Sequence, residues 1–113
     1  MLTQKELNKY LPLSETTFYA MLSLTQPMHG YAIMQNVDQV SQGFVHIGPG
    51  TIYGILSTLE TQGLIRVDGE EERRKYYRLT EKGRQVLREQ IRRLEVMAEN
   101  GRQMIPALEA DMK

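Results

Sequence analysis

The chain of 113 residues contains no cysteine and no tryptophan, and only two histidines, His29 and His46. Without thiols it can form neither disulfides nor thiolate-bound metal sites, and the histidines lie outside any spacing typical of metal ligands. We therefore expect no metal site and no cofactor. The absence of tryptophan also disfavours a large ligand cavity walled by indole rings.

Patterns typical of catalysis are absent as well. Serine and threonine are frequent, but none has a histidine and an acid placed to form a nucleophilic triad. No glycine-rich loop of the kind that holds nucleotide phosphates occurs. The sequence therefore predicts a protein that is not an enzyme.

The sequence has no excess of charge of either sign. The 14 Lys and Arg residues balance 14 Asp and Glu residues, so the basic excess common in nucleic-acid-binding proteins is missing. The N-terminus has no apolar signal segment, from which we expect a soluble cytoplasmic protein with no membrane contact. A length of 113 residues with 41% apolar content predicts one domain, residues 1–113, that would gain stability from a partner subunit.

The cations that are present are distributed unevenly. No Lys or Arg occurs between Lys9 and Arg66. The stretch that follows contains Arg66, Arg73, Arg74, Lys75, Arg78, Lys82, Arg84, Arg88, Arg92 and Arg93. An alternative reading of the last four is that they only solvate a helix face.

An amphipathic helix followed at once by a basic hairpin is the clearest pattern in the chain. Apolar residues at helical spacing form one stripe, namely Ile52, Ile55, Leu56 and Leu59. Gly48-Pro49 is a suitable start for this helix, and Gly63 is a suitable stop. Residues 65–68 and 76–79 then alternate between apolar and polar, with a turn expected to begin at Asp68-Gly69 and a charged tip at residues 70–75. This order is typical of a winged helix-turn-helix, a DNA-binding fold of the α+β class that is mostly α.

Three further helices are expected before this segment. The first lies within residues 2–11 and ends at Pro12, and the second begins after the N-cap Ser14 and stops near Gln26-Pro27. The third opens at His29 or the residue before it and ends before Gly43. Its inward face is predicted to consist of Tyr31, Met34, Val37 and Val40.

The last third of the chain has the spacing of a coiled-coil helix that begins after Thr80. Its seam alternates steps of four and three residues, in the positions Leu87, Ile91, Leu94, Ala98, Gly101, Ile105 and Leu108. We expect residues 81–113 to form a dimerisation helix and residues 1–80 to form the DNA-binding region. Pro106 is expected to kink or end the helix. The alternative is that the stripe packs only on its own domain.

Several separated motifs resemble the PadR family of bacterial transcriptional regulators, in its short form with one C-terminal helix. They are Gly50-Thr51-Ile52-Tyr53, Leu59-Glu60, Gly63-Leu64-Ile65, the run Arg74-Lys75-Tyr76-Tyr77-Arg78-Leu79-Thr80 with Gly83, and upstream His29-Gly30-Tyr31. The resemblance implies that Tyr53 contacts the DNA backbone, although a core tyrosine with a satisfied hydroxyl is an alternative. The chain departs from the family where many members have a Lys or Arg late in this helix and a proline after the tyrosine, because it has Ser57, Thr58 and Gly54 instead.

These observations together predict the DNA-contacting residues. They are Pro49, Gly50, Thr51, Tyr53, Gly54, Ser57 and Thr58 on the helix, and Arg73, Arg74 and Lys75 on the hairpin. Because the helix has no cation, we expect the hairpin to supply most of the electrostatic affinity. A charged hairpin tip that only aids solubility is the alternative.

Two functions from different classes fit the sequence. The first is a homodimeric regulator that binds an inverted repeat in double-stranded DNA, a repressor released by a small apolar effector at the dimer interface. The second is a winged-helix module that binds protein without specific DNA binding. The missing helix cations favour the second, and the basic hairpin favours the first.

Overall fold

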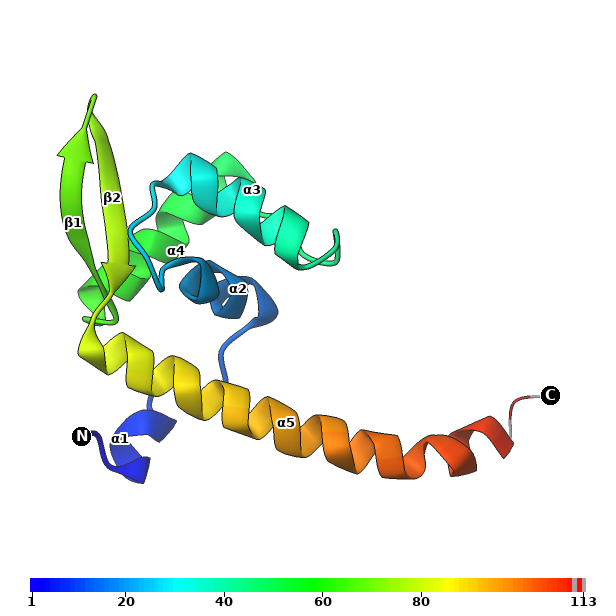
Figure 1. Cartoon of the computed structure of the whole chain (residues 1–113). Helices are drawn as coiled ribbons and strands as arrows, with labels where there is room; N and C mark the ends of the chain where they lie inside the picture. The colour runs from blue at the N-terminus through cyan, green and yellow to red at the C-terminus, as the bar shows by residue number, and fades with distance from the viewer. Residues whose placement is uncertain (111, 113) are drawn as a thin grey trace.

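The computed structural model describes residues 1–110 and Met112 (Figure 1). The elements run in the order α1 (Gln4–Asn8), α2 (Glu15–Ser23), α3 (Gly30–Val40), α4 (Pro49–Thr61), β1 (Ile65–Glu71), β2 (Arg74–Leu79) and α5 (Glu81–Ala110). Helices α2, α3 and α4 pack together with the hairpin beside them, while α5 runs past this group and extends well beyond it (Figure 1). The predicted fold, mostly helical with one small sheet and a long last helix, is confirmed. Within the described residues no helix is both long and apolar enough to cross a membrane.

The helix starts follow the capping residues that the sequence offers. Ser14 accepts a hydrogen bond from the Thr17 amide, and the Thr80 hydroxyl accepts one from the Gly83 amide at 3.0 Å, so both predicted N-caps are confirmed. Helix α1 is shorter than the predicted range because a capping box between Thr3 and Glu6 starts it at Gln4. Helix α2 ends at Ser23, before the predicted stop near Pro27.

The core lies where α2, α3 and α4 meet the hairpin and the first turns of α5. In α4, Ile52, Leu56 and Leu59 are fully covered and Ile55 is half-buried, as the predicted stripe requires. Residues Val45 and Ile47, in the turn between α3 and α4, are also buried and anchor that turn.

The predicted inward face of α3 is partly wrong. Val37 is buried and Met34 is partly buried, but Tyr31 and Val40 are 56% and 53% exposed. The buried face instead contains Gly30 and Ile33 with Val37, which follow the helical steps of three and four residues. Tyr31 is two positions from Ile33 and therefore lies off this face.

The hairpin turns within the predicted charged tip at residues 70–75, but the predicted start of the turn at Asp68-Gly69 is wrong. Strand partners are Val67 with Tyr77 and Glu70 with Lys75, so two residues, Asp68 and Gly69, oppose one in β2 and form a bulge. Gly69 has a φ of +116°, a backbone conformation that glycine adopts easily and residues with a side chain rarely adopt. The turn is made by Glu72 and Arg73, which both have positive φ, the pattern of the type I′ turns that suit the twist of a hairpin.

Pro106 is predicted either to kink or to end α5, and because the helix continues through it to Ala110, the second alternative is wrong. Figure 1 shows the helix axis changing direction toward its C-terminal end. Residues 111 and 113, which belong to the predicted dimerisation segment 81–113, lie outside the described residues.

Three polar side chains of α5 hold the N-terminal segment against the domain. The amides of Leu2 and Leu13 donate to the side-chain oxygens of Gln85 at 2.7 Å and Gln90 at 2.6 Å. Between them, Glu89 is 9% exposed and accepts from Gln4. Because Arg92 donates to Glu89 at 2.8 Å, and Gln4 and Arg93 donate as well, the pKa of the Glu89 carboxyl falls to about 2.

Candidate nucleic-acid interface

The outward face of α4 is mostly small and hydroxylated and has no cation, and its one exposed charge is Glu60 near the C-terminal end. Because Ile52, Leu56 and Leu59 point into the core, the residues between them are turned outward. The exposed set contains Pro49, Gly50, Thr51, Tyr53, Gly54, Ser57 and Thr58. The N-cap Gly48 has no side chain to cap the first amides, which leaves the positive end of the helix dipole open to an anion.

Tyr53 lies on one flank of α4, beside the hairpin. A hollow of about 300 Å³ lies there, lined by His29, Gly30, Tyr31, Tyr53, Arg73, Arg74, Lys75 and Tyr77. The structure thus brings Tyr53 together with the three hairpin cations that the sequence singled out. Burial raises the pKa of the Tyr77 phenol, so this group stays neutral at ordinary pH.

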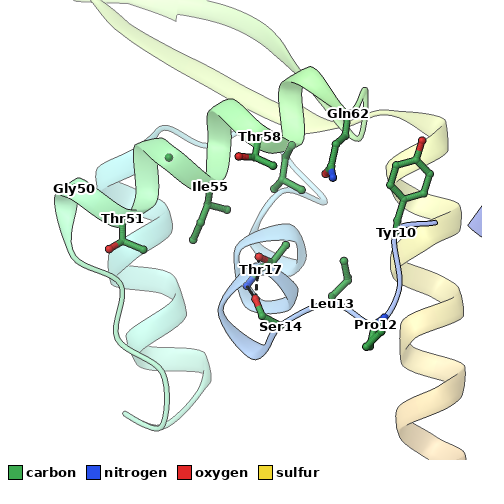
Figure 2. A pocket seen from close by; sticks show the side chains of 12 residues that line it. Tyr10, Pro12, Leu13, Ser14, Thr17, Gly50, Thr51, Ile55, Thr58 and Gln62 are labelled. Atoms are coloured by element: carbon green, nitrogen blue, oxygen red, sulfur yellow. Dashed lines mark hydrogen bonds between the residues drawn. The ribbon is translucent and has the colours of Figure 1, made fainter. Parts of the chain in front are cut away.

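The opposite flank of α4 faces the N-terminal segment and the start of α2. Figure 2 shows Gly50, Thr51 and Thr58 across a groove from Ser14 and Thr17, with Tyr10 and Gln62 at the end nearest α5. The groove has a volume of about 540 Å³, and Gly54 also lines it. Pro49 and Ser57 line neither this groove nor the hollow beside the hairpin.

The arginines and lysines differ in whether they already have partners. Arg66 and Arg78 contact Asp68 at 3.3 and 3.2 Å, and Arg92 and Arg93 contact Glu89. Lys82 donates to the Gln62 carbonyl at 2.9 Å and lies over the Tyr10 ring. The hairpin cations Arg73, Arg74 and Lys75 are exposed, and no carboxylate within residues 1–110 forms a salt bridge with them. They are therefore well placed to meet an external anion.

The sequence predicts His29, Gly30 and Tyr31 at the start of a helix and gives them no part in DNA binding, yet all three line the same hollow. His29 caps α3, since its Nδ1 accepts from the Ala32 amide at 3.3 Å, and its ring meets Tyr76 edge to face at 5.4 Å. The signal available in the sequence was a glycine between two aromatic residues at a helix start. The contact of Gly30 with Tyr53 joins α3 to α4, so the spacing of residues along the chain does not reveal it.

The predicted seam of α5 divides into a covered part and an uncovered part. Leu87 is 4% exposed and packs in the domain core, so it is not an open position for a partner. From Ile91 onward the seam is uncovered in the single chain, with exposed fractions of 36% at Ile91, 37% at Leu94, 43% at Ile105 and 62% at Leu108. Ala98 and Gly101 are exposed as well. A groove of about 690 Å³, lined in part by Leu2, Leu7 and Ile91, lies between α1 and α5 at the start of this uncovered stretch.

Comparison with known proteins identifies relatives of the chain. The family described as "Transcriptional regulator PadR-like family" matches residues 19–89. The chain is 37% identical over 71 residues to the transcriptional regulator YqjI of Escherichia coli (strain K12), a match covering 63% of this chain and 34% of that protein. The matches span only 17% to 34% of the length of the curated relatives.

Solved structures share the fold. A PadR family transcriptional regulator from Eggerthella lenta DSM 2243 is 28% identical with a TM-score of 0.62, covering 78% of this chain and 75% of that one. A transcriptional regulator from Clostridium thermocellum is 24% identical with a TM-score of 0.66. That match covers 93% of this chain and 99% of the other, so the likeness of fold includes the long last helix.

Proposed function

Because the chain belongs to the PadR-like family, whose members are transcriptional regulators and not enzymes, we propose that it binds double-stranded DNA through α4 and the β1–β2 hairpin. The observation that carries this proposal is the meeting of Tyr53 with three exposed hairpin cations around one hollow. Phosphate contacts of this kind position a protein on DNA, and contacts to base edges specify the sequence.

Each part of the interface has a role in the proposal. Gly50 and Gly54 allow α4 to approach the major groove closely, and Ser57 and Thr58 donate to or accept from base edges. Pro49 starts the helix, and the positive end of the helix dipole and Thr51 face a phosphate. Arg73, Arg74 and Lys75 neutralise phosphates on the flank where Tyr53 makes its own backbone contact.

We place this interface in residues 1–80 of a single domain and assign residues 81–113 to dimerisation. The uncovered apolar seam from Ile91 to Leu108 supports a homodimer, because a stripe at coiled-coil spacing is suited to bury itself against a second helix. Two copies of α4 related by a two-fold axis require an inverted-repeat site. Its half-sites lie about one DNA turn, roughly 34 Å, apart or a multiple of that distance.

Regulation in this proposal is repression released by a small apolar effector at the dimer interface. The groove between α1 and α5 supports this location, since Leu2, Leu7 and Leu87 line it next to the seam. An effector bound there acts on DNA binding only if it favours one relative placement of the two protomers.

Gel-shift and footprinting assays on the DNA upstream of the chain's own gene test the proposal. We expect a salt-dependent shift and protection with dyad symmetry. A rival function, a module that binds protein without specific DNA binding, is favoured by the zero net charge and by the lack of cations on α4. Absence of any shift at low salt would support this rival, and protection without dyad symmetry would contradict paired insertion of α4.

A further inference from the structure

The start of α3 is held firmly against the hairpin. Met28 and Tyr77 exchange two backbone hydrogen bonds of 3.0 Å, which form an isolated bridge between the turn before α3 and strand β2. The His29 ring then meets Tyr76 of the same strand edge to face. Gly30, the next residue, is therefore fixed relative to the hairpin and its cations.

The ring of Tyr53 lies directly against Gly30. A Cβ atom at Gly30 would lie 3.1 Å from Cε1, 3.2 Å from Cζ and 3.2 Å from the hydroxyl oxygen of Tyr53. Such contacts are tighter than most contacts of a Cβ atom, so an alanine at this position would push the ring away by a few tenths of an ångström. Tyr53 is 56% exposed, and the ring has room to shift outward without disturbing the core.

The hollow on which these groups converge suits a phosphate. Tyr53 contributes a neutral hydroxyl donor, and Arg73, Arg74 and Lys75 line the same space of about 300 Å³ without carboxylate partners in the described part of the chain. A hydroxyl can donate to a phosphate oxygen only over a short range and a narrow angle, whereas long cationic side chains can adjust. The position of the Tyr53 ring is thus the sensitive part of the hollow.

We propose that this hollow takes one phosphate of the DNA backbone and that Gly30 is a positioning residue for it. By lacking a side chain, Gly30 lets the Tyr53 ring lie against the start of α3 and holds the hydroxyl beside the hairpin cations. The inference rests on the proposed DNA-binding function and adds a residue that acts through the position of Tyr53.

A double-mutant cycle on the full chain tests this role. The probe is a duplex of random sequence at low salt, because backbone contacts do not depend on sequence. Tyr53→Phe removes the hydroxyl and keeps the ring, and should weaken binding about fivefold for each protomer on the duplex, the usual worth of one neutral hydrogen bond. Gly30→Ala should weaken binding measurably, but by less than Tyr53→Phe does, because it moves the hydroxyl by only a few tenths of an ångström. The double variant should bind no more weakly than Tyr53→Phe alone, because the position of the ring no longer matters once the hydroxyl is gone.

The controls separate a positioning role from a loss of folding. Gln39→Ala adds an alanine at an exposed position near the other end of α3 and should bind as the parent does. Thermal unfolding monitored by circular dichroism should show Gly30→Ala folded at the assay temperature. Because Tyr53→Phe is nearly isosteric, it tests the hydroxyl even where the alanine variant is destabilised.

Several outcomes would overturn the inference. Parental affinity of either Tyr53→Phe or Gly30→Ala would show that the hydroxyl or its placement contributes nothing. A full additional loss when Gly30→Ala is added to Tyr53→Phe would show that Gly30 acts through the fold. If the parent binds the duplex and the variants give one of these contrary results, only the role of Gly30 and Tyr53 is overturned. If the parent binds no duplex, the proposed function fails with it.

Discussion

One missing side chain determines how α5 begins. At Gly83 a Cβ atom would lie 2.0 Å from the backbone oxygen of Leu64, at the point where α4 passes into β1. Backbone atoms cannot move aside as the Tyr53 ring can, so this contact requires glycine. Thr80 completes the junction, since its hydroxyl donates to the Gly63 carbonyl at 2.7 Å and its amide to the Leu64 carbonyl at 3.0 Å.

We expect Gly83→Ala to destabilise the protein by about 3 kcal/mol, at the upper end of what overpacking costs. The control is Gly54→Ala, at a helical position where a Cβ would meet nothing within 4 Å. This control should stabilise the protein by about 0.5–1 kcal/mol through helix propensity. Urea unfolding measures both variants, and equal stabilities would contradict the close packing of α5 on Leu64.

Glu89 makes the stability of the protein sensitive to acid. Its folded pKa of about 2 lies below the ordinary value of 4.5, so the carboxylate stabilises the folded state at neutral pH. This contribution is lost as the pH falls from about 4.5 through about 2, because protonation removes the acceptor for Arg92. We expect the urea midpoint of the parent to fall across this window and Glu89→Gln to flatten that part of the profile.

Glu99→Gln is the matched control for this acid response. Glu99 pairs with Arg102 at 2.9 Å with the same spacing along α5, but both partners are more than half exposed. An exposed pair of this kind contributes little to stability. A profile that is flattened equally by Glu99→Gln and Glu89→Gln would contradict a special role for the buried carboxylate.

At the scale of elements, much of the fold follows from local signals in the sequence. The start of α4 at Pro49 and the caps at Ser14 and Thr80 depend on nearby residues, and the sequence predicts them correctly. The sequence predicts the tip of the hairpin but misplaces the start of the turn, because Asp-Gly suits a bulge as well as a turn and the choice depends on pairing across the strands. The face of α3 was misjudged because tertiary packing selects among several apolar residues.

The candidate site also has one part that the sequence predicts and another that only the folded chain shows. The exposed face of α4 and the cations of the hairpin are readable from periodicity and charge. The convergence of Tyr53 with Arg73 and the contact of Tyr53 with Gly30 join three elements, so only the folded chain reveals them. Likewise, the pairing of Arg66 and Arg78 with Asp68 is not apparent from composition, yet it decides which cations are available.

The hairpin should supply most of the salt dependence of DNA binding. If Arg73, Arg74 and Lys75 of both protomers each neutralise one phosphate, log affinity against log salt should have a slope of about −5, from roughly −0.9 per contact. Replacing all three by alanine should nearly abolish the slope and leave the order of sequence preference unchanged. Fluorescence anisotropy across a salt series measures both quantities.

Arg66→Ala with Arg78→Ala is the control for the hairpin variant, because these cations already contact Asp68. This double variant should keep most of the parental slope. If the triple alanine variant keeps the parental slope instead, the cations that hold DNA lie elsewhere on the protein.

At the scale of the whole molecule, α5 has a covered half and an uncovered half. Its first turns complete the core through Val86 and Leu87, and its side chains hold the N-terminal segment. A 30-residue helix is about 45 Å long, more than one small domain can cover. A second copy that buries the remaining apolar stripe would also fix the spacing between two DNA-binding faces.

We therefore expect Leu94→Glu to dissociate the proposed dimer. Leu94 lies in the middle of the uncovered seam and is 37% exposed in the single chain, so the fold should tolerate the change. In the dimer the carboxylate would be buried without a partner, which costs several kcal/mol. Analytical ultracentrifugation at micromolar concentration should show a dimeric parent and a monomeric variant. The monomer should also bind an inverted repeat more weakly, because the two DNA-binding regions are no longer linked.

Val96→Glu is the matched control for the seam. Val96 is 49% exposed and two positions from Leu94, which places it toward the opposite side of α5. The same apolar-to-acidic change there should leave the dimer intact. If Leu94→Glu remains as dimeric as the parent, the seam is wrongly assigned. If only Val96→Glu dissociates, the contacting face of α5 lies on the other side, and the spacing of Leu94, Ala98 and Gly101 has another cause.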